Sequence, residues 1–215
     1  MLLIFNIFEL GIKEGEKNLY VAVGKNNITK SVLNDEGTLG MYLVQEKENP
    51  NMTYMFEVYE DEKSYQEHIK SEQYKEFLRQ SPTILTNHKK KIQVMPEYMG
   101  DKKFVQTRNT RVNYVTVDVK ERFNDTFREI VLDEMKQSIK KEEGVYVIYA
   151  ATAIGNPNKW YFFEIYENEK AYQKHRKTAH FKKYIEQTEN IIENKEFINI
   201  EGIKLLNKGN LNYVK

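Results

Sequence analysis

Residues 54–60 read Tyr-Met-Phe-Glu-Val-Tyr-Glu, and residues 161–167 read Tyr-Phe-Phe-Glu-Ile-Tyr-Glu. The two stretches lie 107 positions apart, and the match extends on both sides without a gap. Between residues 49–70 and 156–177, 14 of 22 positions are identical, where composition alone predicts about one or two. The chain is therefore a tandem duplication. We place the repeats at residues 1–100 and 108–207, with the boundary near the polar residues 100–103.

The second repeat shows the order of its elements most clearly. Valine and tyrosine alternate from Arg111 to Val119, which predicts a strand. The pattern then predicts a helix capped at residues 124–126 and ending near Gly144, a hairpin of strands 145–151 and 160–166, a helical stretch over 169–192 and a last strand over 197–206. This order, β-α-β-β-α-β, is the ferredoxin-like split motif of the α+β class.

A sheet of this kind carries both helices on one face and leaves the other face bare. Because the chain holds two such repeats, the bare faces can cover each other. We therefore expect the two sheets to pack face to face as an α+β barrel formed within one chain. The smallest functional species would be a monomer containing this internal pseudo-dimer, with further homodimerisation open.

Composition excludes several functional classes. The 215 residues include no cysteine, so thiol catalysis and thiolate metal sites are ruled out, and a reducing, cytoplasmic location fits. Charge is balanced, with 33 basic and 32 acidic residues, which argues against binding to nucleic acid. The N-terminus has neither the basic flank of a signal peptide nor the length of a membrane span. No phosphate-binding glycine loop appears, so a nucleotide or flavin cofactor is not expected.

Residues 161–172 and 175–182 resemble the signature of the antibiotic biosynthesis monooxygenase family. The resemblance lies in a strand ending Glu-x-Tyr-x-Asn-Glu, an aromatic helix, and the spacing His-x-x-Thr-x-His-aromatic-Lys. It implies small α+β barrels formed from two sheets. It also implies cofactor-free oxidation of quinols, haem degradation or isomerisation of a sugar phosphate, the activities found among family members.

Two histidines are the first candidates for chemistry. His175 and His180 are five residues apart, which on a continuous helix places them about 140° apart and makes a shared metal ion difficult. We expect a break instead, with Thr178 capping a second helical segment that begins at Ala179. His180 would then lie in the first turn, where the helix dipole favours a neutral imidazole that can act as a base. A purely structural role for both histidines is equally compatible with the sequence.

Asn6 and Asn113 occupy matching positions in apolar strands, where a buried amide needs a partner. Spacing alone favours a surface position. The resemblance favours a pocket, because the haem-degrading branch of the family carries an asparagine in its first strand. That branch's tryptophan is replaced by His68 and His175, and its axial histidine by Leu78 and Ile185. Haem degradation is therefore disfavoured. His88 has no histidine counterpart, because Lys195 occupies the shifted position, and it is expected at the surface.

Aromatic side chains supply the remaining candidates. Trp160 is the only tryptophan and aligns with Thr53, so the second repeat is the richer candidate for a ligand cavity. Most such rings belong to the core. The predicted catalytic residues are His180, His175 and Asn113, and the predicted substrate-binding residues are Trp160, Tyr149, Phe162, Asn6 and His68. Glu57 and Glu164 recur at one strand position, either as buried acids or as partners of lysine.

The leading interpretation is a monooxygenase without cofactor or metal that uses oxygen to oxidise a quinol or polycyclic phenol. A neutral His180, with His175, would deprotonate the phenol, and Asn113 would hold the oxyanion. One alternative is an isomerase that uses the same histidines. Another is a non-catalytic binding or stress-response module.

Overall fold

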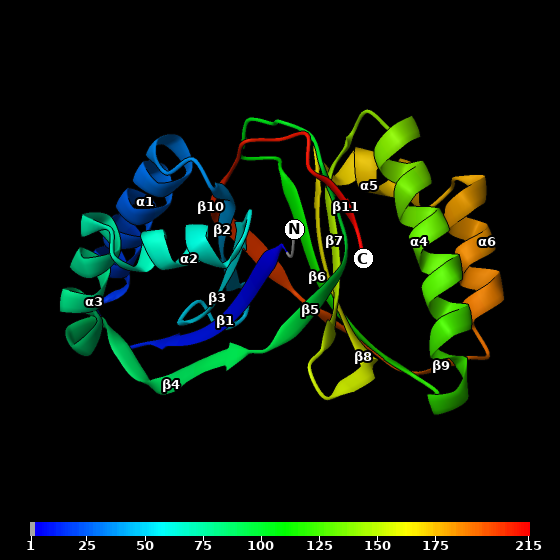
Figure 1. Ribbon diagram of the computed structural model, residues 1–215, viewed down its shortest axis with the longest axis horizontal. Helices are drawn as coiled ribbons and strands as arrows, with labels where there is room; N and C mark the ends of the chain where they lie inside the picture. Colours follow the sequence, from blue (N-terminus) through cyan, green and yellow to red (C-terminus); the bar gives the residue numbers. More distant parts are fainter. Residues whose placement is uncertain (1–2) are drawn as a thin grey trace. The chain divides into compact units, whose positions relative to one another are not determined.

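The computed structural model describes residues 3–215, which form two compact units. Unit 1 contains the residues up to Val94, together with residues 104–106 and 200–209. Unit 2 contains residues 95–103, 107–199 and 210–215. Each unit is an antiparallel sheet with helices on one side (Figure 1).

Unit 1 carries a five-stranded sheet in the order β10-β2-β3-β1-β4. Its strands are β1 (Ile4–Ile12), β2 (Thr38–Glu46), β3 (Met52–Tyr59), β4 (Leu85–Ile92) and β10 (Ile200–Asn207). Its helices are α1 (Lys17–Asn34), α2 (Glu62–Ile69) and α3 (Glu72–Ile84).

Unit 2 carries a six-stranded sheet in the order β11-β5-β7-β8-β6-β9. Its strands are β5 (Val94–Asp101), β6 (Arg111–Val119), β7 (Val145–Ala153), β8 (Asn156–Tyr166), β9 (Ile192–Ile198) and β11 (Asn212–Val214). Its helices are the short η1 (Glu121–Phe123), α4 (Asn124–Lys141), α5 (Glu169–His175) and α6 (Ala179–Thr188).

The predicted β-α-β-β-α-β order is present in both repeats, and the fold class is confirmed. The final strand of each repeat differs from the prediction. The predicted single strand over 197–206 is two strands that break at Asn199: β9 pairs with β6 in unit 2, while β10 pairs with β2 in unit 1. Strand β5 of the first repeat correspondingly lies beside β7 in unit 2. The units therefore follow the repeats except for one exchanged strand each, which local periodicity could not reveal. Face-to-face packing of the two sheets stays a prediction.

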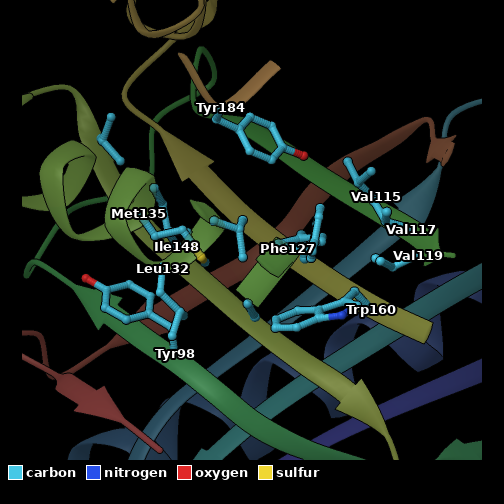
Figure 2. Packing of buried hydrophobic residues seen from close by; sticks show 14 of the residues in the cluster. Tyr98, Val115, Val117, Val119, Phe127, Leu132, Met135, Ile148, Trp160 and Tyr184 are labelled. Carbon is cyan, nitrogen blue, oxygen red and sulfur yellow. The ribbon is translucent and has the colours of Figure 1, made fainter. Parts of the chain in front are cut away.

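Strand alternation decides which side chains of unit 2 face the helices. Trp160 and Phe162 on β8 and Val115 and Val117 on β6 belong to one buried cluster with Phe127 of α4, and Figure 2 shows this packing around Trp160. Glu164 continues the same alternation, because successive strand residues point to opposite faces. A carboxylate is thereby placed at the edge of an apolar core.

The predicted helix break is confirmed. Helix α5 ends at His175, and α6 begins at Ala179 with Thr178 as its N-cap. The Thr178 hydroxyl accepts a hydrogen bond from the Phe181 backbone N–H at 3.3 Å and donates one to the His175 carbonyl at 2.7 Å. Because the chain turns here, two histidines five residues apart can approach the same neighbour.

The predicted cap of α4 is not formed by Asn124. Phe123 occupies the N-cap position without a side-chain hydrogen bond, and the Asn124 side chain instead accepts one from the Trp160 indole N–H at 2.9 Å. Among residues 3–215, no helix is both long and apolar enough to cross a membrane.

Candidate acid–base site

A cavity of about 50 Å³ lies in unit 2 between the sheet and the helices. Its polar lining consists of Glu134, Glu164, His175 and Lys195, and the rest is aliphatic or aromatic: Val115, Val117, Val131, Met135, Phe162, Tyr172, Phe181, Tyr184 and Phe197. Binding pockets for drug-sized ligands span roughly 300–1,000 Å³. The cavity in this conformation therefore suits a very small molecule or a few waters.

His175 is the histidine that lines this cavity. It is the last residue of α5 and only 2% exposed. Its Nδ1 lies 3.0 Å from Oε1 of Glu142, and its Nε2 lies 3.8 Å from Oε1 of Glu134. Burial opposes protonation of this ring, but the hydrogen bond to Glu142 and the charges of Glu134 and Glu164 outweigh it and raise the pKa of His175. His175 therefore takes up a proton more readily than an ordinary histidine.

Glu134 is the second acid–base group. It lies on the buried side of α4 and is 7% exposed. Burial raises its pKa to about 7, against the opposing effects of His175 and of the Ser138 hydroxyl, which donates a hydrogen bond at 2.6 Å. A carboxyl group with a pKa near the working pH exchanges protons readily, as general acid–base catalysis requires.

Glu142 joins the two histidines behind the cavity. It follows the last residue of α4 and is 8% exposed. Its Oε1 lies 3.0 Å from His175 Nδ1 and 2.6 Å from His180 Nε2. Burial opposes its ionisation, but the hydrogen bonds with both imidazoles prevail and lower the pKa of Glu142. The Oε1 atom can accept from whichever of the two facing nitrogens carries a proton.

His180 does not line the inner cavity. It lies in the first turn of α6, as expected from the sequence, and contributes to a separate outer hollow of about 210 Å³ between α4 and α6. The outer hollow is lined by Glu129, Ile130, Asp133, Glu134, His180, Lys183, Tyr184 and Gln187. Glu134 and Tyr184 line both spaces.

Asn113 acts on the cavity through Glu164. Its Nδ2 donates to Glu164 Oε2 at 3.1 Å, and the Tyr166 hydroxyl donates to the same oxygen at 2.9 Å. Asn113 Oδ1 in turn accepts from Arg111 Nε at 3.1 Å. The amide is buried and has a partner at each end, so its role in this structure is to orient a carboxylate.

Lys195 stands at the rim of the cavity. The residue as a whole is exposed, but its ammonium lies over the Tyr184 ring, 5.8 Å from the centroid, and partial desolvation there lowers its pKa in spite of Glu164. The neighbouring rim residue Phe197 is 45% exposed. Strand β9 therefore forms the side of the cavity nearest to solvent.

Three side chains of the site could in principle approach one metal ion. Glu134, His175 and His180 place one donor atom each within 4.8 Å of one another. Each imidazole contacts Glu142 through one ring nitrogen, which leaves its other nitrogen available. We assign no metal to these residues, and the metal-free site stays a prediction.

The equivalent cluster in unit 1 is built from neutral partners. Nδ1 of His68 lies 3.2 Å from the Ser31 hydroxyl and 3.9 Å from Asp35, while Gln73 donates to both Ser31 and Asp35. The Ser31 hydroxyl donates to Asn27 at 3.3 Å. His68 is fully buried, its Nε2 has no hydrogen-bond partner, and burial lowers its pKa to about 4. The pKa of His68 is therefore lowered where that of His175 is raised.

Asn6 faces Glu57 across β1 and β3. It helps to restrain the pKa of Glu57, which burial nevertheless raises to about 7, although Nδ2 of Asn6 makes no hydrogen bond of good geometry. The contact between Asn6 and Glu57 is therefore weaker than that between Asn113 and Glu164. Of the two explanations that the sequence offered for Glu57, pairing with a lysine was the commoner one, but the side chain is a buried acid, 5% exposed.

The aromatic candidates separate into two groups. Phe162 lines the cavity, whereas Trp160 is fully buried in the core, stacked on Phe162 at 5.9 Å between ring centroids. Tyr149 is also fully buried and donates to Asp101 rather than lining the cavity. His88 is a surface residue, as expected, with Nε2 2.7 Å from Glu9.

Sequence reasoning missed Glu134, Glu142 and Lys195. The duplication contained a signal for all three. At a shift of 107 residues, Glu134, Glu142 and Lys195 align with Asn27, Asp35 and His88. The second repeat therefore has a carboxylate in place of an amide, a longer carboxylate in place of a shorter one, and a lysine in place of a histidine. Only the folded chain shows that these changes gather around His175.

The chain is thus an α+β protein made of two ferredoxin-like repeats, and each repeat holds an acid–base cluster between its sheet and its helices. The sequence model of the antibiotic biosynthesis monooxygenase family matches residues 3–80 and 110–187, and the chain belongs to this family. The fold agrees with that of a proposed monooxygenase from Lactobacillus acidophilus NCFM, at 29% identity and a TM-score of 0.94, with 99% of this chain and 100% of that chain covered.

A proposed monooxygenase from Fusobacterium nucleatum gives 28% identity and a TM-score of 0.93, covering 100% of this chain and 98% of that one. An anthrone oxidase-like protein shares the fold at 9% identity and a TM-score of 0.56, over 96% and 97% of the two chains. None of the curated proteins compared with this chain matches it.

Proposed function

We propose that unit 2 is a cofactor-independent monooxygenase acting on a hydroquinone or related phenol. The observation that carries the proposal is the pairing of Glu134, whose pKa is about 7, with His175, whose pKa is raised, in one cavity. Membership of a monooxygenase family supplies the reaction class. The small cavity favours a single-ring substrate over a polycyclic one.

The reaction balances without an external reductant. A hydroquinone and one molecule of oxygen give a hydroxyquinone and one molecule of water. The substrate supplies all the electrons: one oxygen atom becomes the new ring carbonyl, and the other leaves as water. Such chemistry requires that a proton be removed first, because the phenolate reduces oxygen far more readily than the phenol.

Each cavity group then has a role. Glu134 accepts the hydroxyl proton, and the Lys195 ammonium at the rim stabilises the developing phenolate. The anion transfers one electron to oxygen, and the resulting radicals combine to form a ring peroxide. His175 protonates the peroxide and then accepts the ring C–H proton as the O–O bond breaks. The departing hydroxide takes the proton from Glu134, which restores both groups.

Asn113 contributes as a positioning residue, since it holds Glu164 beside the cavity. Asn113 therefore contacts the Glu164 carboxylate and not the oxyanion that the sequence led us to expect, but it still belongs to the proposed site. Trp160 supports the wall of the cavity through Phe162. The partners in this proposal are molecular oxygen and a small phenolic substrate that the protein meets in the cytoplasm.

The test is oxygen uptake with hydroquinone, methylhydroquinone and larger quinols, with product and water formation followed by ¹⁸O₂ labelling. We expect one labelled oxygen in the product and a loss of turnover of roughly 100-fold or more in Glu134→Gln, the scale of general acid–base catalysis. The matched control is Asn27→Asp in the first repeat, which alters the equivalent position outside the cavity.

No oxygen uptake with any quinol would overturn the proposal. Exchange of substrate C–H protons with deuterated water, without oxygen uptake, would instead favour the isomerase alternative, since the same pair can shuttle protons. Ligand-dependent thermal stabilisation without either reaction would favour a binding module.

A further inference from the structure

The inner cavity and the outer hollow of unit 2 meet at a row of acid–base groups, of which Glu134 lines both spaces. His175 lines the inner cavity, His180 lines the outer hollow, and Glu142 contacts both rings. The two contacts involve the same oxygen, Oε1, at 3.0 and 2.6 Å. Both distances are short enough for direct proton transfer along hydrogen bonds.

We propose that Glu142 and His180 form a proton path that connects the inner cavity with solvent in the outer hollow. This deepens the proposed function and, as a catalytic role, rests on it. Glu142 and His180 are positioning residues in this scheme, because neither lines the cavity that would hold the substrate.

The transfer balances with these three side chains and water. The N–H bond of the His175 imidazolium breaks at Nδ1 as an O–H bond forms at Glu142 Oε1. That O–H bond then breaks as His180 Nε2 takes the proton, which it can do in its Nδ1–H tautomer. The resulting His180 imidazolium releases its Nδ1 proton to water. Reversal of these steps brings a proton inward.

The path would let a buried site exchange protons with solvent. A complete turnover restores both groups, but Glu134 must be ionised and His175 protonated before the first turnover and after any turnover that is interrupted, and both side chains are almost fully buried. The groups that face them are Glu142, Glu164, the Ser138 hydroxyl, the Tyr166 ring and His180, and among these Glu142 contacts both imidazoles. A proton can therefore reach the outer hollow without the cavity opening.

The first repeat lacks the same path, which makes it an internal reference. Gln73 stands where His180 stands, and an amide does not take up a proton near neutral pH. Asp35 is one methylene shorter than Glu142 and lies 3.9 Å from His68 Nδ1, beyond hydrogen-bond distance. The path thus depends on two substitutions that distinguish the repeats.

The experiment compares the full-length chain with His180→Gln, which copies the first repeat, and Glu142→Gln, which keeps the size but accepts no proton. Asp35→Asn in the first repeat is the control. We expect His180→Gln to lower kcat by at most about 10-fold with little change in KM, less than the loss for a group that itself transfers the substrate proton, because a complete turnover restores both buried groups. Exogenous imidazole should restore much of the rate, because it can carry protons into the outer hollow.

A readout independent of turnover is the rate at which the His175 ring proton exchanges with water, measured by NMR on ¹⁵N-histidine-labelled protein. We expect exchange at His175 to slow at least 10-fold in both variants and to remain unchanged in Asp35→Asn. Unchanged exchange would overturn the path. If exchange slows but no quinol is oxidised by the unaltered protein, the proton path stands and the proposed function fails.

A merely structural role for His180 predicts a different pattern. Turnover would then fall together with the melting temperature, and imidazole would restore neither. That result would also overturn the path.

Discussion

His68 and His175 occupy the same position of the two repeats, yet their surroundings give them opposite acid–base character. Nδ1 of His68 faces a serine hydroxyl at 3.2 Å, whereas Nδ1 of His175 faces the Glu142 carboxylate at 3.0 Å. Burial lowers the pKa of His68 to about 4, while nearby carboxylates overcome burial and raise the pKa of His175. The duplicated fold therefore shifts the pKa values of two equivalent histidines in opposite directions.

The lowered pKa of His68 predicts a specific sensitivity to acid. The unfolded chain protonates this residue near pH 6.5, but the folded chain does so only near pH 4, so stability should fall as the pH drops between these values. The loss attributable to His68 is on the order of 1–3 kcal/mol. Urea unfolding of His68→Gln, measured from pH 7 to pH 4, should show a shallower decline than the unaltered protein. An identical decline would place the acid sensitivity elsewhere.

Glu57 predicts the reverse trend at higher pH. Burial raises its pKa from 4.5 to about 7, although the Tyr59 hydroxyl, Asn6 and Lys91 oppose the shift. The folded state therefore binds the proton more tightly than the unfolded state, and this contribution to stability is lost as the pH rises from about 4.5 through 7. The effect is on the order of 2–3 kcal/mol. Glu57→Gln keeps an acceptor for Tyr59 and should gain stability relative to the unaltered protein at pH 8 but not at pH 4.

The structure assigns Trp160 to the core, and a conservative substitution can test this. Trp160→Phe removes part of a fully buried ring and leaves the Asn124 side chain without its indole donor. We expect a loss of about 1–3 kcal/mol in the free energy of unfolding, measured in urea. A quinol KM that rises while stability is unchanged would return Trp160 to the predicted substrate-binding role.

The prediction that the protein works without a cofactor or metal is tested by analysis of the purified chain. We expect a colourless protein with no flavin or haem absorption and without stoichiometric transition metal after dialysis. A bound metal that disappears in His180→Gln but persists in His68→Gln would contradict this and locate the ion at the unit 2 histidines.

The sequence predicted local structure well where periodicity and capping decide it. Strand β6 and the start of α6 at Ala179 lie where the sequence placed them, because alternation and the Thr178 cap are local signals. Strand β10 was misjudged, since nothing local distinguishes a continuous strand over 197–206 from two strands that join different sheets.

The residues of the candidate site were likewise predicted where the signal is local and missed where it depends on distant parts of the chain. The His175–Thr178–His180 spacing is local and drew attention to both histidines. Glu134 and Glu142 lie 41 and 33 residues before His175 in the chain. Their importance depends on the packing of α4 against α5 and α6, which only the fold supplies. Aromatic content marked both Trp160 and Phe162 as pocket residues, and of these two Phe162 lines the cavity while Trp160 does not.

Carboxylate length at the end of α1 and α4 should control the pKa of the facing histidine. In unit 1 the Asp35 carboxylate lies 3.9 Å from His68 Nδ1, with Ser31 occupying the closer position, whereas the longer Glu142 reaches His175 at 3.0 Å. Asp35→Glu should therefore raise the pKa of His68 above 4, because an opposite charge within hydrogen-bond distance favours the imidazolium. Glu142→Asp should lower the pKa of His175 for the converse reason. Histidine titration by NMR measures both shifts in the same chain, and each variant leaves the other unit as its control. Unchanged titration of His68 in Asp35→Glu would mean that burial alone keeps this ring neutral, and that the difference between the repeats does not arise from the carboxylate.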